Sequence, residues 1–411
     1  MKKMLDIELY NEKNALQNIP NIIRKHNIDN LLIVCDDNTY KAAGKKIEEI
    51  LYDINIKKFN IGKDQYAYKN LCEQLHIFCK QNNITGILGV GTGTINDICK
   101  YTAYLSEIPY IIVATAPSMD GFCSTVAALI DDGFKRTLDA KVPIAVLGDP
   151  EILDNAPKEL ISAGIGDLIG KYICLADWKI SSLVTDEVYD EKIAEITRQS
   201  VNQAMDSIED IINNKEGSTL KLMDALCMSG IAMAMCGSSR PASGAEHHLS
   251  HFWEMRFLAL NKKQILHGTK VGISSAIISQ IYHKLSDVEN ISHLIKNPPV
   301  LNESYLYNSY GKLTDEVIND NYPDPIEKID RNKLVSNWTE IRKILKSIVQ
   351  PDKIRQLLKI TGGSIYPSDI GIDNALVFEG VKFCRYLRPR LTMLRISDII
   401  DIDTSKYIQI P

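Results

Sequence analysis

The sequence predicts an α/β domain built on a parallel sheet, followed by an all-helical domain. Between about residues 30 and 150, short apolar runs alternate with helical segments, which is typical of a parallel sheet covered by helices. After Pro157 the apolar residues recur instead at the spacing of long helices. Because 411 residues exceed the size at which one core keeps growing, we expect two domains, 1–157 and 158–411.

The elements of the first domain follow from its apolar runs and from the helical segments between them. Leu31–Cys35 is an uninterrupted apolar run and is expected to be the first strand. The alternation ends at the turn-forming residues Gly148-Asp149-Pro150. The expected strands are 31–35, 54–59, 86–90, 109–113 and 144–147, and the expected helices are 36–52 and 68–82.

The second domain should contain helices alone. Its apolar residues keep the 3.6-residue helical period over long stretches. The segment from Asn297 to Asn321 interrupts the series with an Asn-Pro-Pro sequence and a Tyr/Asn-rich run, so we expect an exposed linker there. The expected helices are about 159–183, 190–213, 217–236, 244–260, 268–285, 314–320 and 335–348.

Composition narrows the class of partner to small molecules. The net charge of −5 gives no basic footprint, which argues against nucleic acid or an acidic membrane surface as a partner. The nine cysteines form no CxxC pair and are scattered through apolar runs, as expected of reduced core thiols in the cytoplasm. The N-terminus lacks the apolar segment of a secretion signal. We therefore expect a soluble, cytoplasmic protein.

Four of the eight histidines fall between His247 and His267, and this clustering indicates a metal site. Ser243 followed three residues later by Glu246 forms a capping-box pattern, which predicts a helix start and places His247 and His251 on one face. A catalytic metal usually takes three protein ligands, and the lone carboxylate of Asp167 in an apolar stretch is the best third candidate. The competing interpretation is an ordinary pair of helical histidines, since HxxxH alone is a weak pattern.

A glycine-rich turn between a predicted strand and a predicted helix, at residues 89–100, indicates an anion site for a diphosphate. The glycines follow the third strand, unlike those of the standard dinucleotide fingerprint, and an ordinary turn remains the alternative. An acid, Asp36, ends the first strand instead. The next strand exit, residues 114–124, is rich in hydroxyls that could bind phosphate or ribose.

Four motifs together resemble the sn-glycerol-1-phosphate dehydrogenase family, within the superfamily of iron-type alcohol dehydrogenases, glycerol dehydrogenases and dehydroquinate synthases. The resemblance runs from about residue 30 to the C-terminus and implies a Rossmann-like domain followed by an all-α domain, the dehydroquinate synthase-like fold. The motifs are Gly89-Val-Gly-Thr-Gly-Thr-Ile-Asn-Asp97, Ala116-Pro-Ser-Met-Asp120-Gly, Gly237-Ser-Ser-Arg240-Pro-Ala-Ser-Gly-Ala-Glu-His247 and His267-Gly-Thr-Lys270-Val-Gly272.

The resemblance also implies roles for individual residues. Asp120 and His251 would hold the substrate, and Asp167, His247 and His267 would bind the metal. The residues implied at the nicotinamide cofactor are Asp36, Gly91, Gly93, Thr94, Ile95, Asn96, Asp97, Thr115, Ala116, Pro117, Ser118 and Ser124.

Two further residues, His248 and Arg240, lie on or just before the predicted helix that carries His247 and His251. His248 departs from a simple ligand pattern, and because helical geometry turns it about 100° from His247 we expect it behind the ligands or at the surface. Arg240 is our candidate for binding a substrate phosphate, because a guanidinium matches phosphate in bidentate fashion. Its competing role is that of a surface arginine near a helix start.

The expected activity is the interconversion of sn-glycerol 1-phosphate and dihydroxyacetone phosphate, with NAD or NADP and one divalent metal, zinc, nickel or iron. We expect a small phosphorylated three-carbon substrate, no nucleic-acid or membrane partner, and a homo-oligomer. Two alternatives stay open. One is another reaction on the same scaffold, such as glycerol oxidation or a dehydroquinate synthase-like reaction; the other is a nucleotide-binding sensor without turnover.

Overall fold

The computed structural model describes residues 6–63, 65–131 and 134–410. The chain forms two compact units, and each is made of two chain segments. Unit 1 comprises Met1–Leu168 and Gln199–Ser238, and unit 2 comprises Ile169–Arg198 and Ser239–Pro411. The predicted domain boundary between residues 157 and 158 stays a prediction.

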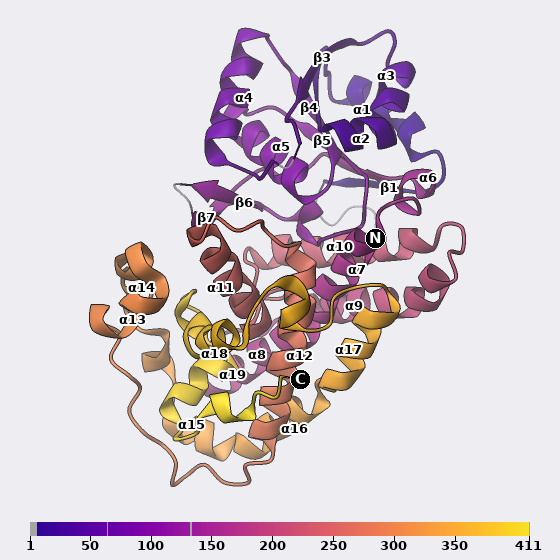
Figure 1. The fold of residues 1–411 in the computed structure, drawn as a ribbon. Helices are drawn as coiled ribbons and strands as arrows, with labels where there is room; N and C mark the ends of the chain where they lie inside the picture. Colours follow the sequence, from indigo (N-terminus) through magenta and orange to yellow (C-terminus); the bar gives the residue numbers. More distant parts are fainter. Residues whose placement is uncertain (1–5, 64, 132–133, 411) are drawn as a thin grey trace. The chain divides into compact units, whose positions relative to one another are not determined.

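Unit 1 is built on a six-stranded parallel sheet, as the sequence predicts (Figure 1). The strands lie in the order β1-β8-β5-β4-β2-β3. The prediction lacked β1, whose four residues are only half-buried and show no apolar run. The strands are β1 (Glu8–Asn11), β2 (Asn30–Cys35), β3 (Asn55–Asn60), β4 (Gly86–Gly91), β5 (Tyr110–Ala114) and β8 (Ala145–Gly148).

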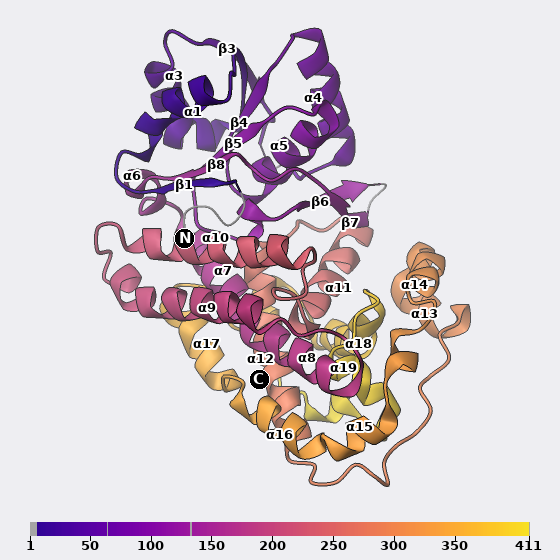
Figure 2. The same cartoon turned by 180° about the vertical axis from the view of Figure 1, so that it is seen from behind.

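Helices cover both faces of this sheet (Figures 1 and 2). On one face lie α1 (Ile19–Lys25) and α3 (Lys45–Ile50), and on the other lie α4 (Lys69–Gln81) and α5 (Gly93–Ser106). Successive side chains of a strand point to opposite faces, so each strand supplies both cores. Every central strand must therefore be apolar throughout, which is why these strands could be recognised in the sequence.

The order of strands creates a switch point between β2 and β4. The chain leaves β2 for β3 on one side and then returns, through α4, to β4 on the other side of β2. In open parallel sheets, ligands bind in the crevice outside the carboxyl ends of the strands at such a point. Asp36 follows β2 and Gly91 ends β4, so both lie at this edge.

Unit 1 also contains a pair of strands that the sequence did not predict and the helix that was expected at 217–236. β6 (Val126–Asp131) and β7 (Phe134–Asp139) form a separate antiparallel pair, and the two residues between them lie outside the described residues. Among the described helices, α10 (Ser218–Cys236) is long and apolar enough to cross a membrane by length and composition. However, 61% of its apolar window is buried, and its Met223 and Cys227 belong to a core on one face of the sheet. It therefore has the character of a core helix.

Beyond α6 (Pro150–Leu153) the described chain contains only helices and loops, apart from one isolated bridge between Ile295 and Ile400, so the all-helical prediction is confirmed. The single helix expected at 159–183 is divided at Gly170 into two. The helices are α7 (Lys158–Ile169), α8 (Lys171–Val184), α9 (Glu191–Ile212), α11 (Ala245–Ala259), α12 (His267–Ser286), α13 (Glu303–Tyr310), α14 (Thr314–Asp320), α15 (Arg331–Ser336), α16 (Trp338–Ser347), α17 (Pro351–Ile360), α18 (Asn374–Phe383) and α19 (Met393–Ile396).

The expected linker at 297–321 is wrong over much of its length. Asn302 caps α13 by accepting a hydrogen bond from the Tyr305 amide, so the Asn-rich run starts a helix. Leu306 and Tyr310 on that helix are buried in the core of unit 2. Leu306 and Tyr310 are four residues apart and so lie on one helix face, but the polar residues around them gave the segment the composition of a loop.

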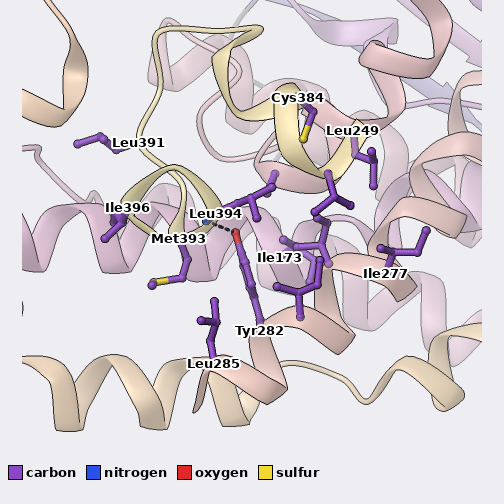
Figure 3. Close-up of a cluster of buried hydrophobic side chains, with 14 of the residues drawn as sticks. Ile173, Leu249, Ile277, Tyr282, Leu285, Cys384, Leu391, Met393, Leu394 and Ile396 are labelled. Carbon is purple, nitrogen blue, oxygen red and sulfur yellow. Dashed lines mark hydrogen bonds between the residues drawn. The ribbon is translucent and has the colours of Figure 1, made fainter. Parts of the chain in front are cut away.

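Tyr282 of α12 lies completely buried among the apolar side chains of the core of unit 2 (Figure 3). The phenol accepts a hydrogen bond from the Leu394 amide at 3.1 Å and donates one to Asp177 of α8 at 2.7 Å. Apolar side chains from α8, α11 and α12, among them Ile173 and Leu249, belong to the same buried cluster. A polar group this deep needs such partners, because an unsatisfied buried hydroxyl is costly.

Asp177 joins four helices through one carboxylate. Besides the Tyr282 phenol it accepts hydrogen bonds from the amides of Met393 at 2.7 Å and Ala245 at 2.9 Å. Burial and the neighbouring carboxylate of Glu246 raise its pKa from the ordinary 3.8 to about 7, although these three donors oppose the rise. The starts of α11 and α19 are therefore fixed to α8 and α12 by a group that holds its proton unusually well.

The pH dependence of stability should reveal this carboxyl. In the folded protein Asp177 keeps its proton above the ordinary pKa of 3.8, so the stabilisation it contributes is complete below that value and is lost as pH rises through about 7. The free energy of unfolding of the wild type, relative to Asp177→Asn, should therefore fall across this interval. Denaturant unfolding at several pH values measures the difference. The exposed Asp186→Asn should follow the wild type, and a flat difference for Asp177→Asn would contradict the assignment.

Candidate metal and substrate site

The helix α11 starts one residue later than the predicted capping box. Its N-cap is Gly244, not Ser243, and the buried Glu246 carboxylate accepts the Gly244 amide at 2.9 Å. A β-carbon on Gly244 would lie 2.6 Å from Asp177 Oδ2 and 2.8 Å from Glu246 Oε2. Glycine is therefore required here, because two carboxylates converge on this one position.

Glu246 also orients the next residue. Its Oε1 lies 2.6 Å from Nδ1 of His247, and the Glu246 side chain is completely buried. A carboxylate on one ring nitrogen fixes the tautomer and raises the basicity of the other nitrogen, which is the usual arrangement behind a metal-binding histidine. With Nδ1 beside Glu246, Nε2 is the nitrogen of His247 that could bind a metal.

The predicted histidine cluster forms within unit 2. The rings of His247 and His251 lie one turn apart on α11 with centroids 6.1 Å apart, and His267 is the first residue of α12. The His267 ring centroid is 5.2 Å from each of the other two. Imidazole nitrogens are ligands that zinc, nickel and iron accept, so this cluster could supply ligands to such an ion.

A chain of polar contacts extends from His251 into the interior. His251 Nδ1 lies 3.1 Å from Glu254 Oε2, and Glu254 Oε1 lies 3.0 Å from Lys270 Nζ. Lys270 and Glu254 are both buried, so this ion pair is shielded from solvent. The sequence interpretation missed Glu254. Its signal was the i, i+3 spacing from His251, which places the two side chains on one helix face.

His248 is buried and does not lie at the surface. It is 1% exposed, and within the described residues neither ring nitrogen has a hydrogen-bond partner. Burial lowers its pKa well below the ordinary value, and the charges of Arg390 and Arg388 lower it further. His248 is therefore a neutral imidazole.

Asp120 and Asp167 come together in unit 1. The Asp120 amide donates to Asp167 Oδ2 at 3.0 Å, and Ser229 of α10 donates to Asp120 Oδ2 at 2.8 Å. Two glycines allow this approach: a β-carbon on Gly164 of α7 would lie 1.9 Å from the Pro117 carbonyl oxygen, and one on Gly230 of α10 would lie 2.7 Å from the Asp120 carbonyl oxygen. The two predicted acids are thus held together by close backbone packing.

The residues predicted to bind the nucleotide lie at the carboxyl edge of the sheet. A β-carbon on Gly91 would lie 2.4 Å from Ile95 Cδ1, so glycine lets α5 return closely over β4. Thr92 caps α5, and its hydroxyl lies 2.7 Å from that of Ser118. Gly91, Gly93, Thr94, Ile95, Asn96 and Asp97 occupy the end of β4 and the start of α5, and Thr115, Ala116, Pro117 and Ser118 occupy the turn after β5.

Asp36 and Ser124 also have local structural partners. Asp36 Oδ1 caps the helical segment after β2 by accepting the amides of Asn38 and Thr39, both at 2.8 Å. Its Oδ2 makes no hydrogen bond within the described residues, as a ribose ligand would require. The hydroxyl of Ser124 accepts a hydrogen bond from the buried Lys100 at 3.0 Å. The cofactor contacts of both residues stay predictions.

Arg240 is almost fully buried rather than at the surface. Its Nε and Nη2 donate to the two carboxylate oxygens of Glu187 at 2.7 and 3.0 Å, and Nη2 also donates to the carbonyls of Asp177 and Leu391. These contacts give Arg240 a structural function, and its contact with a substrate phosphate stays a prediction.

Comparisons with known proteins identify the family of the chain. Residues 10–157 match the family described as iron-containing alcohol dehydrogenase. A protein of Geobacillus thermodenitrificans named glycerol-1-phosphate dehydrogenase (NAD(P)+) is 36% identical, over 92% of this chain and 89% of its own length. One of Bacillus subtilis with the same name is 30% identical, over 93% and 89%.

Solved structures share the fold. The crystal structure of a probable glycerol dehydrogenase from Sinorhizobium meliloti superposes with a TM-score of 0.65 at 15% identity and covers 98% of this chain and 95% of its own. Its fold confirms the predicted architecture. The relatives from Geobacillus thermodenitrificans and Bacillus subtilis, which match over most of their length, show the family within that fold. The chain belongs to the glycerol-1-phosphate dehydrogenase family of iron-type alcohol dehydrogenases.

Proposed function

We propose that the protein is a metal-dependent, NAD(P)-linked oxidoreductase that interconverts sn-glycerol 1-phosphate and dihydroxyacetone phosphate. The observation that carries this proposal is the cluster of His247, His251 and His267, in which the buried Glu246 orients His247. The relatives of the chain that are named glycerol-1-phosphate dehydrogenase support the same activity. A nucleotide sensor without turnover would not need this arrangement.

Asp167, His247 and His267 would hold the metal. Two imidazoles and one carboxylate fit the three-ligand pattern of catalytic metal sites, and the fixed tautomer of His247 fits a ligand role. When bound, a divalent ion supplies a Lewis acid that polarises the ketone oxygen. Zinc, nickel and iron all accept this donor set.

His251 is placed to serve as the proton donor or acceptor. Glu254 engages Nδ1, so Nε2 is the nitrogen that can exchange a proton with the substrate oxygen. Lys270 neutralises the other oxygen of Glu254 and keeps the carboxylate in place. Asp120, whose carboxylate is positioned by Ser229, would hold a substrate hydroxyl.

The nicotinamide cofactor would bind at the carboxyl edge of the sheet. The start of α5 presents backbone N–H groups and the positive end of a helix dipole to a diphosphate. Asp36 would accept a ribose hydroxyl and in the simple picture disfavours the 2′-phosphate of NADP. A cytoplasmic location and a homo-oligomeric state stay predictions from the sequence.

The metal assignment separates two adjacent histidines. His247→Ala removes a ligand, so bound metal and activity should fall together, whereas His248→Gln should retain the metal because the His248 ring points off the shared face. Elemental analysis after reconstitution and gel filtration measures the metal. Loss of metal from the His248 variant with retention in the His247 variant would show that the ligand is misassigned.

The activity itself is tested with a substrate panel. The chelated protein is reconstituted with zinc, nickel or iron and assayed with dihydroxyacetone phosphate or dihydroxyacetone, each with NADH or NADPH. We expect metal-dependent oxidation of the nicotinamide and a higher kcat/KM with the phosphorylated ketone. A preference for the unphosphorylated ketone would replace the proposal by glycerol dehydrogenase activity.

A further inference from the structure

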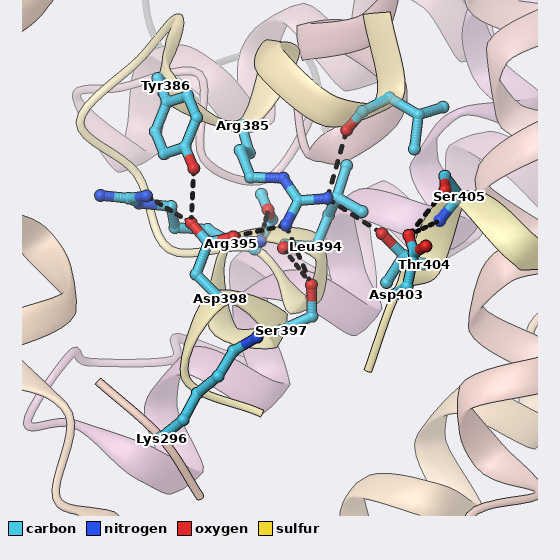
Figure 4. Close-up of polar contacts among 12 residues, drawn as sticks. Lys296, Arg385, Tyr386, Leu394, Arg395, Ser397, Asp398, Asp403, Thr404 and Ser405 are labelled. Atoms are coloured by element: carbon cyan, nitrogen blue, oxygen red, sulfur yellow. Dashed lines mark hydrogen bonds and ion pairs between the residues drawn. The ribbon is translucent and has the colours of Figure 1, made fainter. Parts of the chain in front are cut away.

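Buried arginines of unit 2 are neutralised by specific carboxylates. Arg385 and Arg395 each donate to one oxygen of Asp398 at 2.6 Å (Figure 4). Arg395 also donates to both oxygens of Asp324. Arg240 engages both oxygens of Glu187. This is the expected pattern, because a buried charge is costly unless it is paired.

Arg390, which is only partly buried, lacks such a partner. Its Nη1 donates to the carbonyls of Ser243 at 2.6 Å and Ser239 at 3.5 Å, and its Nη2 donates to the Ser239 hydroxyl at 3.0 Å. Within residues 6–63, 65–131 and 134–410 it forms no ion pair with a carboxylate, and its Nε makes no hydrogen bond. The guanidinium is thus held in position by neutral acceptors alone.

Other positive charges lie near Arg390 and are not matched by a carboxylate that is available to it. Burial lowers the pKa of Arg390 to about 10, and the like charges of Arg240 and Arg388 add to the effect. The carboxylate of Glu187 opposes the shift, but both of its oxygens already bind Arg240. Positive charge therefore exceeds negative charge at Arg390, and an anion bound there would relieve the imbalance.

The segment that anchors Arg390 leads directly into the metal-binding helix. Ser243, whose carbonyl it binds, is four residues before His247. The Ser239 hydroxyl accepts from Arg390, so its own O–H can be donated to a ligand. The lysines of this region are engaged otherwise: Lys171 donates to the Ala242 carbonyl, and Lys270 pairs with Glu254.

We propose that Arg390, with the Ser239 hydroxyl, binds the phosphate group of the substrate. This inference rests on the proposed function and adds the residue that selects a phosphorylated ketone. Arg240, whose charge Glu187 neutralises, is then a structural neighbour, while Arg390 makes the direct contact with the phosphate. A guanidinium with a free edge is suited to phosphate, which it can bind through parallel hydrogen bonds.

The test compares Arg390→Met with Arg240→Met, a variant of the neighbouring arginine that has its own carboxylate. The measured quantity is the ratio of kcat/KM for dihydroxyacetone phosphate to that for dihydroxyacetone. In Arg390→Met the ratio should fall on the order of 100-fold, the scale of losing a desolvated charge contact, and Arg390→Lys should restore part of it. Arg240→Met should slow both ketones to a similar degree. A full selective loss in Arg240→Met with none in Arg390→Met would overturn the proposal.

Binding of inorganic phosphate separates this inference from the proposed function. Calorimetric titration of the metal-loaded wild type should show phosphate binding that Arg390→Met weakens strongly, with metal content unchanged in both proteins. Equal phosphate affinity in the two proteins would refute the role of Arg390 even if the wild type reduces dihydroxyacetone phosphate. If the wild type prefers dihydroxyacetone while phosphate binding still requires Arg390, the proposed function fails and the anion site stands.

Discussion

Two buried carboxylates, Asp177 and Glu246, meet at the start of α11, and the geometry of the histidine cluster depends on this meeting. Asp177 accepts the first amide of the helix, and Glu246 accepts the amide of the N-cap Gly244 and orients His247. Burial and the neighbouring charge of Glu246 disfavour ionisation of Asp177, so its pKa is raised. The fold keeps this costly arrangement because it fixes the position and tautomer of His247 together.

Much of the fold could be predicted because its signals are local. Strands buried on both faces must be apolar throughout, and His247 and His251 one turn apart can be recognised from spacing alone. Other features depend on tertiary partners that no spacing reveals. The helix α11 begins after Gly244 because Asp177, which is distant in sequence, accepts a hydrogen bond from the Ala245 amide. The helix at 303–310 is stabilised because Leu306 is buried in the core of unit 2.

Charge pairing in unit 2 shows the same limit. Arg240 and Arg390 are both basic residues near predicted turns, and the sequence favoured Arg240 because of its motif. The structure gives Arg240 a carboxylate partner and leaves Arg390 on neutral acceptors. An ion pair formed inside the protein removes most of the attraction of an arginine for an external anion. Tertiary structure therefore determines which of the two arginines can bind a ligand, and the sequence alone does not reveal it.

The orientation of His247 by Glu246 is the central claim, and zinc affinity tests it most directly. Glu246→Gln keeps the size of the side chain but removes the charge that fixes Nδ1 of His247. The apparent dissociation constant for zinc, measured by competition with a chromophoric chelator, should rise about 10- to 100-fold, while circular dichroism shows an intact helical fold. An unchanged zinc affinity in a folded Glu246→Gln variant would contradict the account.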